Sequence, residues 1–155
     1  MNNLVKFAIE QLYYSSCSER EMRNILLEKF RNNPQAQKLL DISMDYLKTN
    51  GLINDWQLAE RLAMNYTHKG NRFIFKLLNQ RKIDPSVIAD VISKLPAERT
   101  RALHEALRKI KSLSCKEDAR FVLIRFLNGR LFSGAAIKEA LQQVFSQKNL
   151  KHDFA

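Results

Sequence analysis

The sequence contains few residues that interrupt helices. Only 4 of its 155 residues are glycine and only 3 are proline. All-β folds need many tight turns, and tight turns depend on these two residue types. Their scarcity disfavours a turn-rich β-sandwich and favours helices joined by short connections. With 45% hydrophobic residues, a chain of this length can still bury a core of its own.

Cysteines and long apolar runs are also scarce. Cys17 and Cys115 lack a CxxC partner and are too few for a disulfide framework, so we expect two reduced thiols. Charged residues recur throughout, and no segment reaches the roughly 20 apolar residues of a membrane helix. The first residues lack a basic start, an apolar run and a cleavage site, which predicts a cytoplasmic protein with no membrane contact.

Motifs for catalysis and for cofactor binding are missing. The sequence has no GxxxxGK[ST] or GxGxxG phosphate-binding loop. The three histidines, His68, His104 and His152, have no Cys, Asp, Glu or second His at a helical spacing of three or four residues. Nothing in the sequence brings a base to Cys17, and Ser-Cys-Ser-Glu at 16–19 instead resembles a helix N-terminus. We therefore expect neither enzymatic activity, nor a cofactor, nor a metal.

Amphipathic helical spacing is what the sequence does contain. Met22, Ile25, Leu26 and Phe30 recur at intervals of three and four residues, which indicates a helix. Similar stripes recur along the chain, and no segment shows the sustained alternation of a strand. The predicted helices are Leu4–Tyr14, Ser18–Arg31, Pro34–Thr49, Asp55–His68, Asn71–Arg81, Pro85–Leu95, Ala97–Leu113, Lys116–Asn128 and Ser133–Gln147.

The helical pattern repeats about every 50 residues. Leu26, Leu78 and Leu127 fall into register, and Lys29, Arg81 and Arg130 each lie three residues after them. The repeat predicts three groups of three helices, at residues 1–50, 51–96 and 97–147, followed by a C-terminal tail at 148–155. A group of this size buries its apolar faces only marginally, so we expect an all-α fold whose groups stack into an elongated, curved array. The alternative is one compact globule of nine helices with accidental similarity.

Positive charge is the strongest feature of the composition. The chain has 26 Lys and Arg against 16 Asp and Glu, a net charge of +10. The 22 residues from Arg61 to Lys82 hold six of the cations and no acid, and residues 119–138 hold Arg120, Arg125, Arg130 and Lys138, again with no acid. Solvated helix faces and helix C-termini attract single cations. The loss of every acid favours a polyanionic partner, which rewards cations through counterion release.

Aromatic residues accompany these cations. Phe73 and Phe75 flank a core position of the Asn71–Arg81 helix, and Phe121 is adjacent to Arg120. Nucleobases stack on such rings in proteins that bind single strands. Packing between helices is the alternative role, and phenylalanines in helices more often have it.

The middle of the chain contains three short motifs. Residues 46–59 read YLKTNGLINDWQLA, residues 69–74 read KGNRFI and residues 78–84 read LNQRKID. These segments resemble the RecX family of recombinase regulators, whose pattern is YLxxxGLIDDxx[FY]A followed by KGxxxIxxxLxxKGI. Three positions depart from it: Asn54 replaces an acid, Leu58 an aromatic residue and Lys82 a glycine. These departures affect the details of a helix cap and of a turn.

The resemblance implies a function without catalysis. Proteins of this family bind along the groove of the RecA–DNA filament and inhibit strand exchange, ATP hydrolysis and co-protease activity, which links them to DNA repair and the SOS response. We therefore expect a monomer that contacts a RecA-type recombinase and the single-stranded DNA within its filament. The candidate contact residues are Lys69, Arg72, Lys76, Arg81, Lys82, Arg120, Arg125 and Arg130. The alternative is an autonomous basic helical-repeat protein that binds single-stranded DNA or RNA.

Overall fold

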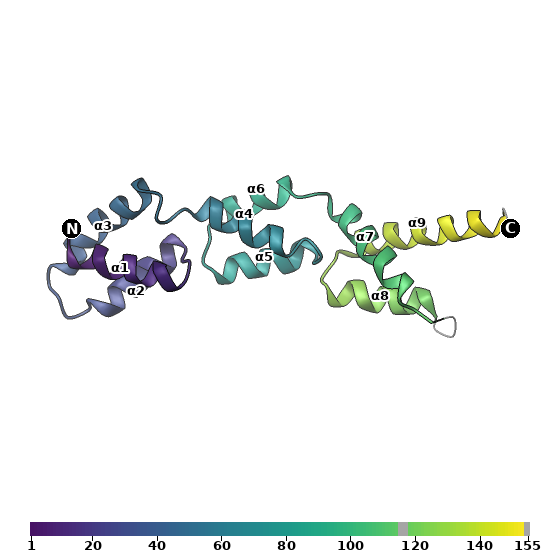
Figure 1. The fold of residues 1–155 in the computed structure, drawn as a ribbon, viewed down its shortest axis with the longest axis horizontal. Coiled ribbons are helices and arrows are strands. Elements are labelled where there is room, and N and C mark those ends of the chain that lie inside the picture. Colours follow the sequence, from purple (N-terminus) through teal and green to yellow (C-terminus); the bar gives the residue numbers. More distant parts are fainter. Residues whose placement is uncertain (115–117, 154–155) are drawn as a thin grey trace. The chain divides into compact units, whose positions relative to one another are not determined.

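The computed structural model describes residues 1–114 and 118–153, with side chains through residue 146. Within these residues the chain forms nine α-helices and no strand, which confirms the all-α prediction (Figure 1). The helices are α1 (Asn3–Tyr14), α2 (Glu19–Lys29), α3 (Ala36–Thr49), α4 (Asp55–Asn65), α5 (Asn71–Gln80), α6 (Pro85–Lys94), α7 (Glu98–Lys111), α8 (Ala119–Gly129) and α9 (Gly134–Asp153).

The helix ends agree with the sequence patterns to within three residues, except at the end of α9. That helix continues to Asp153, past the predicted end at Gln147. The predicted helix start at Lys116 lies outside the described residues. No described helix is both long enough and apolar enough to span a bilayer. The scarcity of glycine and proline within the apolar stripes thus correctly predicted that these segments are helices.

The chain divides into two compact units. The first contains Met1–Leu62 and Leu78–Val91, and the second contains Ala63–Leu77 and Ile92–Ala155. The boundary passes through α4, α5 and α6, so each unit contains one part of these helices. The division into three groups at 1–50, 51–96 and 97–147, and the elongated array built from them, stay predictions.

The core of the first unit joins α1, α2 and α3. Each helix turns one apolar stripe inward, and Phe7 packs edge to face on Phe30 with 5.8 Å between ring centroids. The start of α2 is fixed by a capping box, in which Ser18 accepts from the Glu21 backbone N–H and the Glu21 side chain accepts from the Ser18 N–H. The buried core residues are Leu4, Val5, Ala8, Met22, Leu26, Leu40, Met44, Leu47 and Ile53.

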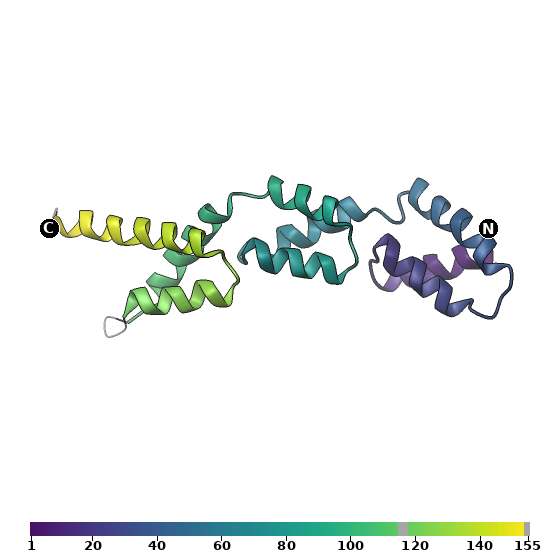
Figure 2. The same cartoon turned by 180° about the vertical axis from the view of Figure 1, so that it is seen from behind.

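The core of the second unit joins α7, α8 and α9, which Figures 1 and 2 show from opposite sides. Ala102 and Ala106 are fully buried on α7, and Ala136 and Ala140 are buried on α9. Small side chains on both helices let their backbones approach closely. The other buried residues of this core are Leu123, Leu127, Phe132, Ile137, Leu141 and Val144.

The connection between α3 and α4 retains its expected cap. Gly51 ends α3 with φ of +70°, a left-handed conformation that glycine adopts without steric cost. Asn54 then caps α4, because its Oδ1 accepts from the Gln57 N–H at 3.1 Å. Asparagine caps helices about as well as aspartate. The departure from the family pattern at Asn54 therefore leaves the cap in place.

Lys82 occupies a strained backbone position. Its φ is +60°, and Leu131, the residue that comes after the register-equivalent Arg130, has φ of +61°. The left-handed conformation costs a residue with a Cβ about 1 to 2 kcal/mol. This explains why the family pattern has glycine at the position of Lys82.

Replacing this lysine by glycine should stabilise the protein. Lys82→Gly removes the strain but increases the entropy of the unfolded chain, so we expect a gain of about 1 kcal/mol or less. Urea denaturation of the full chain measures it. Lys82→Ala keeps the Cβ and serves as the control. A glycine variant less stable than the alanine variant would contradict this interpretation.

Candidate functional site

The eight candidate residues differ in how far they are available to a partner. Arg72, Lys76, Lys82, Arg120 and Arg125 are exposed, whereas Lys69, Arg81 and Arg130 are partly buried. Arg81 and Lys82 belong to the first unit, and the other six belong to the second. The exposed members of the second unit lie on two helices, α5 and α8.

Several of these cations lie over aromatic rings. In the second unit the Arg125 guanidinium is 5.8 Å from the ring centroid of Phe121, and that of Arg120 is 4.8 Å from Phe145. Lys69 Nζ lies 5.1 Å from the centroid of Phe73. Such contacts hold the cation in one place while it stays in water. Phe121 is itself 56% exposed, so α8 presents an aromatic ring and two arginines to solvent.

Arg81 is paired within the first unit. Its Nε donates to both carboxylate oxygens of Glu21 at 3.2 Å, and its Nη2 donates to the carbonyl of Ser16 at 2.8 Å. Because Glu21 also belongs to the capping box of α2, Arg81 holds the start of that helix. Its positive charge is largely offset, so its main role is in folding.

Arg130 has the corresponding position in the second unit. Its Nη1 donates to Glu105 Oε2 at 3.3 Å and to the carbonyl of His68 at 3.2 Å. Glu105 is only 4% exposed and also accepts from Arg108 at 3.4 Å. A buried carboxylate needs such partners. Arg130 therefore neutralises Glu105 and contacts the turn that precedes α5.

Arg101 is a structural residue that the sequence patterns did not indicate. It is only 5% exposed, and its guanidinium contacts the turn between α4 and α5. Its Nη1 donates to the carbonyls of Lys69 at 2.6 Å and Thr67 at 3.3 Å, and its Nη2 donates to Asn71 Oδ1. Burial lowers the pKa of Arg101. The side chain nevertheless stays charged, because the pKa of a free guanidinium lies far above neutral pH. This side chain fixes the backbone that carries Lys69 into the start of α5.

Further contacts hold the same turn. Glu98 Oε2, at the start of α7, accepts from the Asn71 N–H at 2.7 Å. The Gly70 N–H donates to the carbonyl of Arg130, also at 2.7 Å. Gly70 lies so close to this stretch of backbone that a Cβ on it would be 2.0 Å from the carbonyl oxygen of Leu131. Only glycine fits there.

The first unit repeats these contacts. Asp55 Oδ1, at the start of α4, accepts from the Glu19 N–H at 2.8 Å, as Glu98 accepts from Asn71. Arg81 donates to the carbonyl of Ser16, as Arg130 donates to that of His68. We call each such pair of contacts a junction. In a junction, an acid accepts from the first N–H of a helix, and an arginine donates to a carbonyl of the turn before that helix. The junction supports the repeat that the sequence predicts.

Burial changes the pKa of three other groups near the junctions. It raises the pKa of the Asp55 carboxyl, against the opposing hydrogen bond from Glu19. Burial, followed by the Arg130 charge, lowers the pKa of His68, which favours a neutral ring. Burial and Glu21 raise the pKa of the free Cys17 thiol, which favours the protonated form. Cys115 lies outside the described residues, within which no cluster of three metal-ligating side chains occurs.

Removing the Arg101 guanidinium should destabilise the second unit. Arg101→Met keeps an unbranched apolar side chain but leaves the carbonyls of Thr67, Lys69 and Pro96 without this donor. A buried carbonyl left unpaired costs about 1 to 3 kcal/mol. Because these three carbonyls belong to exposed or half-buried residues, water can replace part of the lost donor, and we expect a total loss of about 3 kcal/mol, the low end of the summed range, in urea denaturation. Arg99→Met, at a side chain 67% exposed, is the control and should change stability by less than about 0.5 kcal/mol. Equal stability of the two variants would show that Arg101 is dispensable.

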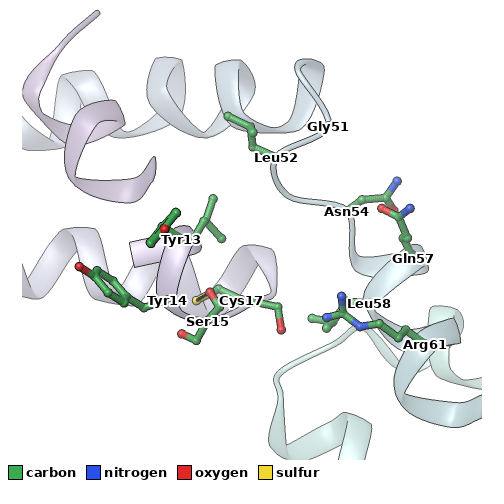
Figure 3. Close-up of a pocket in the computed structure, with 12 residues that line it drawn as sticks. Tyr13, Tyr14, Ser15, Cys17, Gly51, Leu52, Asn54, Gln57, Leu58 and Arg61 are labelled. Carbon is green, nitrogen blue, oxygen red and sulfur yellow. Dashed lines mark hydrogen bonds between the residues drawn. The ribbon is translucent and has the colours of Figure 1, made fainter. Parts of the chain in front are cut away.

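Two grooves lie beside the junctions. The first groove, in the first unit, has a volume of about 370 Å³ and is lined by the end of α1, the turn after it and the start of α4. Figure 3 shows Tyr13 and Tyr14 on one side of it, and Asn54, Gln57 and Arg61 on the other. The second groove, in the second unit, has a volume of about 540 Å³ and is lined by Met64, Thr67, His68, Pro96 and one side of α7.

Comparisons with known proteins agree with the resemblance seen in the sequence. No protein-family model matches the chain. It is 27% identical over 141 residues to the protein named Regulatory protein RecX from Clostridium acetobutylicum, an alignment that covers 85% of this chain. The chain spans 64% of the length of that curated relative.

Solved structures share the fold. The crystal structure of RecX from Lactobacillus salivarius matches with a TM-score of 0.70 at 19% identity, over 90% of this chain and 93% of that one. A second crystal structure, of a regulatory protein RecX, matches with a TM-score of 0.63 at 18% identity, over 90% of this chain and 70% of that one. The resemblance to the RecX family is therefore confirmed in sequence and in fold.

Proposed function

We propose that this chain, as its resemblance to RecX proteins in sequence and fold suggests, is a non-enzymatic regulator of a RecA-type recombinase. It binds the filament that the recombinase forms on single-stranded DNA in the cytoplasm. There it inhibits ATP hydrolysis, strand exchange and co-protease activity, and so restrains recombination and DNA repair.

The observation that carries the proposal is the acid-free segment at 61–82 and its structural support. Within the second unit, Arg72 and Lys76 are exposed on α5, directly after a turn held by Arg101, Arg130 and Glu98. A rigid mounting lowers the entropy that the cations lose on binding a phosphate backbone. The contact residues we propose are Lys69, Arg72, Lys76, Arg120 and Arg125 in the second unit and, separately, Lys82 in the first. Arg81 and Arg130 support them through their ion pairs.

Inhibition results from occupancy of the filament. The lysines and arginines of this chain contact the phosphates of the bound strand and displace its counterions. They thereby prevent a second DNA from binding beside that strand. Contacts with the protein part of the filament favour whichever filament state they fit better. By linkage, the regulator shifts the equilibrium between states only as far as its affinities for them differ.

A second candidate function is autonomous binding of single-stranded DNA or RNA. The arginines that lie over Phe121 and Phe145 favour it, because proteins that bind single strands combine cations with aromatic rings. In that case the affinity for bare strands would equal the affinity for strands coated with recombinase.

A recombinase ATPase assay tests the proposal. Substoichiometric additions of the full chain should suppress DNA-dependent ATP hydrolysis by a RecA-type recombinase, since each bound molecule affects an assembled filament. Salt titration of binding to bare and coated dT oligonucleotides accompanies the assay. Unchanged ATP hydrolysis, together with equal affinity for both forms of the strand, would reject the regulator and leave the strand-binding protein.

A further inference from the structure

The two grooves are equivalent by the internal repeat. Asp55 and Glu98 make the same junction contact, which aligns α4 with α7. The register of the leucines aligns the end of α1 with the end of α4. Under these two alignments the lining residues correspond in pairs: Leu12 with Met64, Ser15 with Thr67, Ser16 with His68, Gln57 with Thr100, Leu58 with Arg101, and Arg61 with His104.

The grooves share a chemical character. Each has a basic side chain at the same position, Arg61 in the first groove and His104 in the second. Hydroxyl and amide side chains line the first groove, and the hydroxyls of Thr67 and Thr100 line the second together with the basic side chains of His68, Arg101 and Arg108. Among the described residues, no acid lines the first groove. The acid that lines the second is Glu105, which is buried and already paired with Arg108 and Arg130. Both grooves are therefore suited to accept one carboxylate.

Apolar side chains at the rims have no evident role in folding. Tyr13 and Tyr14 are 85% and 84% exposed and contact each other edge to face at 5.3 Å. Tyr66, the repeat equivalent of Tyr14, instead packs on Phe73 within the second unit. Met64 is 62% exposed at the second groove. Tyrosine, methionine and arginine are enriched where proteins bind other proteins.

The charge of the grooves favours a protein occupant over a nucleic acid strand. Each groove has only one or two available cations among the described residues that line it. The exposed cations of α5 and α8, in contrast, belong to sequence segments that contain no acid. A strand with a charge on every phosphate fits the latter surface better. One carboxylate with an apolar neighbour fits the grooves.

We propose that each groove docks a segment of the recombinase in which a carboxylate lies beside an apolar side chain. The inference rests on the proposed function, which supplies the partner. Two equivalent grooves call for two copies of one segment, and a filament of identical protomers presents such copies. The carboxylate pairs with Arg61 in the first groove and with His104 in the second, while the rims contact the apolar side chain.

Charge reversal in each groove tests the proposal. The probe is a RecA-type recombinase filament assembled on a fluorescent dT oligonucleotide with a non-hydrolysable ATP analogue. We expect Arg61→Glu and His104→Glu each to weaken binding of the full chain to this filament by roughly tenfold, and the double variant by about the product of the two. Lys38→Glu, on the exposed face of α3 outside both grooves, is the matched control and should bind as the unaltered chain does.

The bare dT oligonucleotide separates the possible outcomes. Binding to it should be the same for all variants, since the grooves do not contact the strand. Equal loss on bare and coated strands would overturn the inference by making nucleic acid the occupant. Unaltered binding of the double variant to the filament would also overturn it but would leave the proposed function intact. Failure of the unaltered chain to bind the filament would reject both. Thermal melts confirm that the variants, changed at exposed positions, are folded.

Discussion

Gly70→Ala should destabilise the second unit more than any other glycine-to-alanine substitution there. The new Cβ would lie 2.0 Å from the carbonyl oxygen of Leu131, 2.3 Å from its carbonyl carbon and 2.5 Å from the Phe132 nitrogen. All three are backbone atoms, so no side chain can rotate away. Relief requires that the turn separate from residues 130–132, which also breaks the 2.7 Å hydrogen bond from the Gly70 N–H to Arg130.

We expect a loss of more than about 5 kcal/mol, in the range that only exceptional substitutions reach. Urea denaturation followed by circular dichroism measures it on the full chain. Gly129→Ala and Gly134→Ala are matched controls, because a Cβ at either position meets no atom within 4 Å. These two should be neutral or stabilising by up to about 1 kcal/mol. A Gly70→Ala variant as stable as the controls would show that the turn adjusts freely.

Reversing the charge of Arg72 and Lys76 together should abolish inhibition of the recombinase ATPase. Both side chains are exposed on α5, one helical turn apart, and belong to a segment without acids. Arg72→Glu with Lys76→Glu replaces two contacts to the strand by two repulsions. Each lost phosphate contact also lowers the salt dependence of binding by about one unit of slope. The loss of inhibition should therefore be nearly complete at physiological salt.

A matched double variant separates this effect from a general change of charge. Lys6→Glu with Lys38→Glu changes the net charge equally at two exposed positions of the first unit. It should inhibit as the unaltered chain does. Because all four side chains are exposed, both double variants should keep their helicity, which circular dichroism checks. If the folded Arg72 and Lys76 variant inhibited normally, the surface on α5 would have to be abandoned.

The helices could be predicted from the sequence because their signals are local. Apolar spacing defines the stripe of each helix, and Ser18 with Glu21, or Asn54 with Gln57, lie within one turn of each other. The resemblance to RecX proteins likewise rests on short segments. Such patterns need no knowledge of distant contacts.

The roles of the arginines could not be predicted, because their partners are distant in sequence. Arg101 and Lys69 are 32 residues apart, Arg81 and Glu21 are 60, and Arg130 and His68 are 62. In the sequence, Arg81 lies in the same acid-free segment as the exposed Arg72, and Arg130 lies in the second such segment, so local charge does not distinguish them. Only the fold brings an acid and a carbonyl to them and distinguishes a supporting arginine from one that is available to a partner.

The recurrence of the junction bears on how such a chain can grow in evolution. The middle three helices carry both halves of the contact. Asp55 and Arg81 contact the start of α2 and the turn before it. In the same way the Asn71 N–H donates to Glu98, and the His68 carbonyl accepts from Arg130. Under the grouping that the sequence predicts, a tandem duplication of the DNA that encodes residues 51–96 would therefore supply its own matching ends. Lengthening by such duplications needs no newly evolved interface.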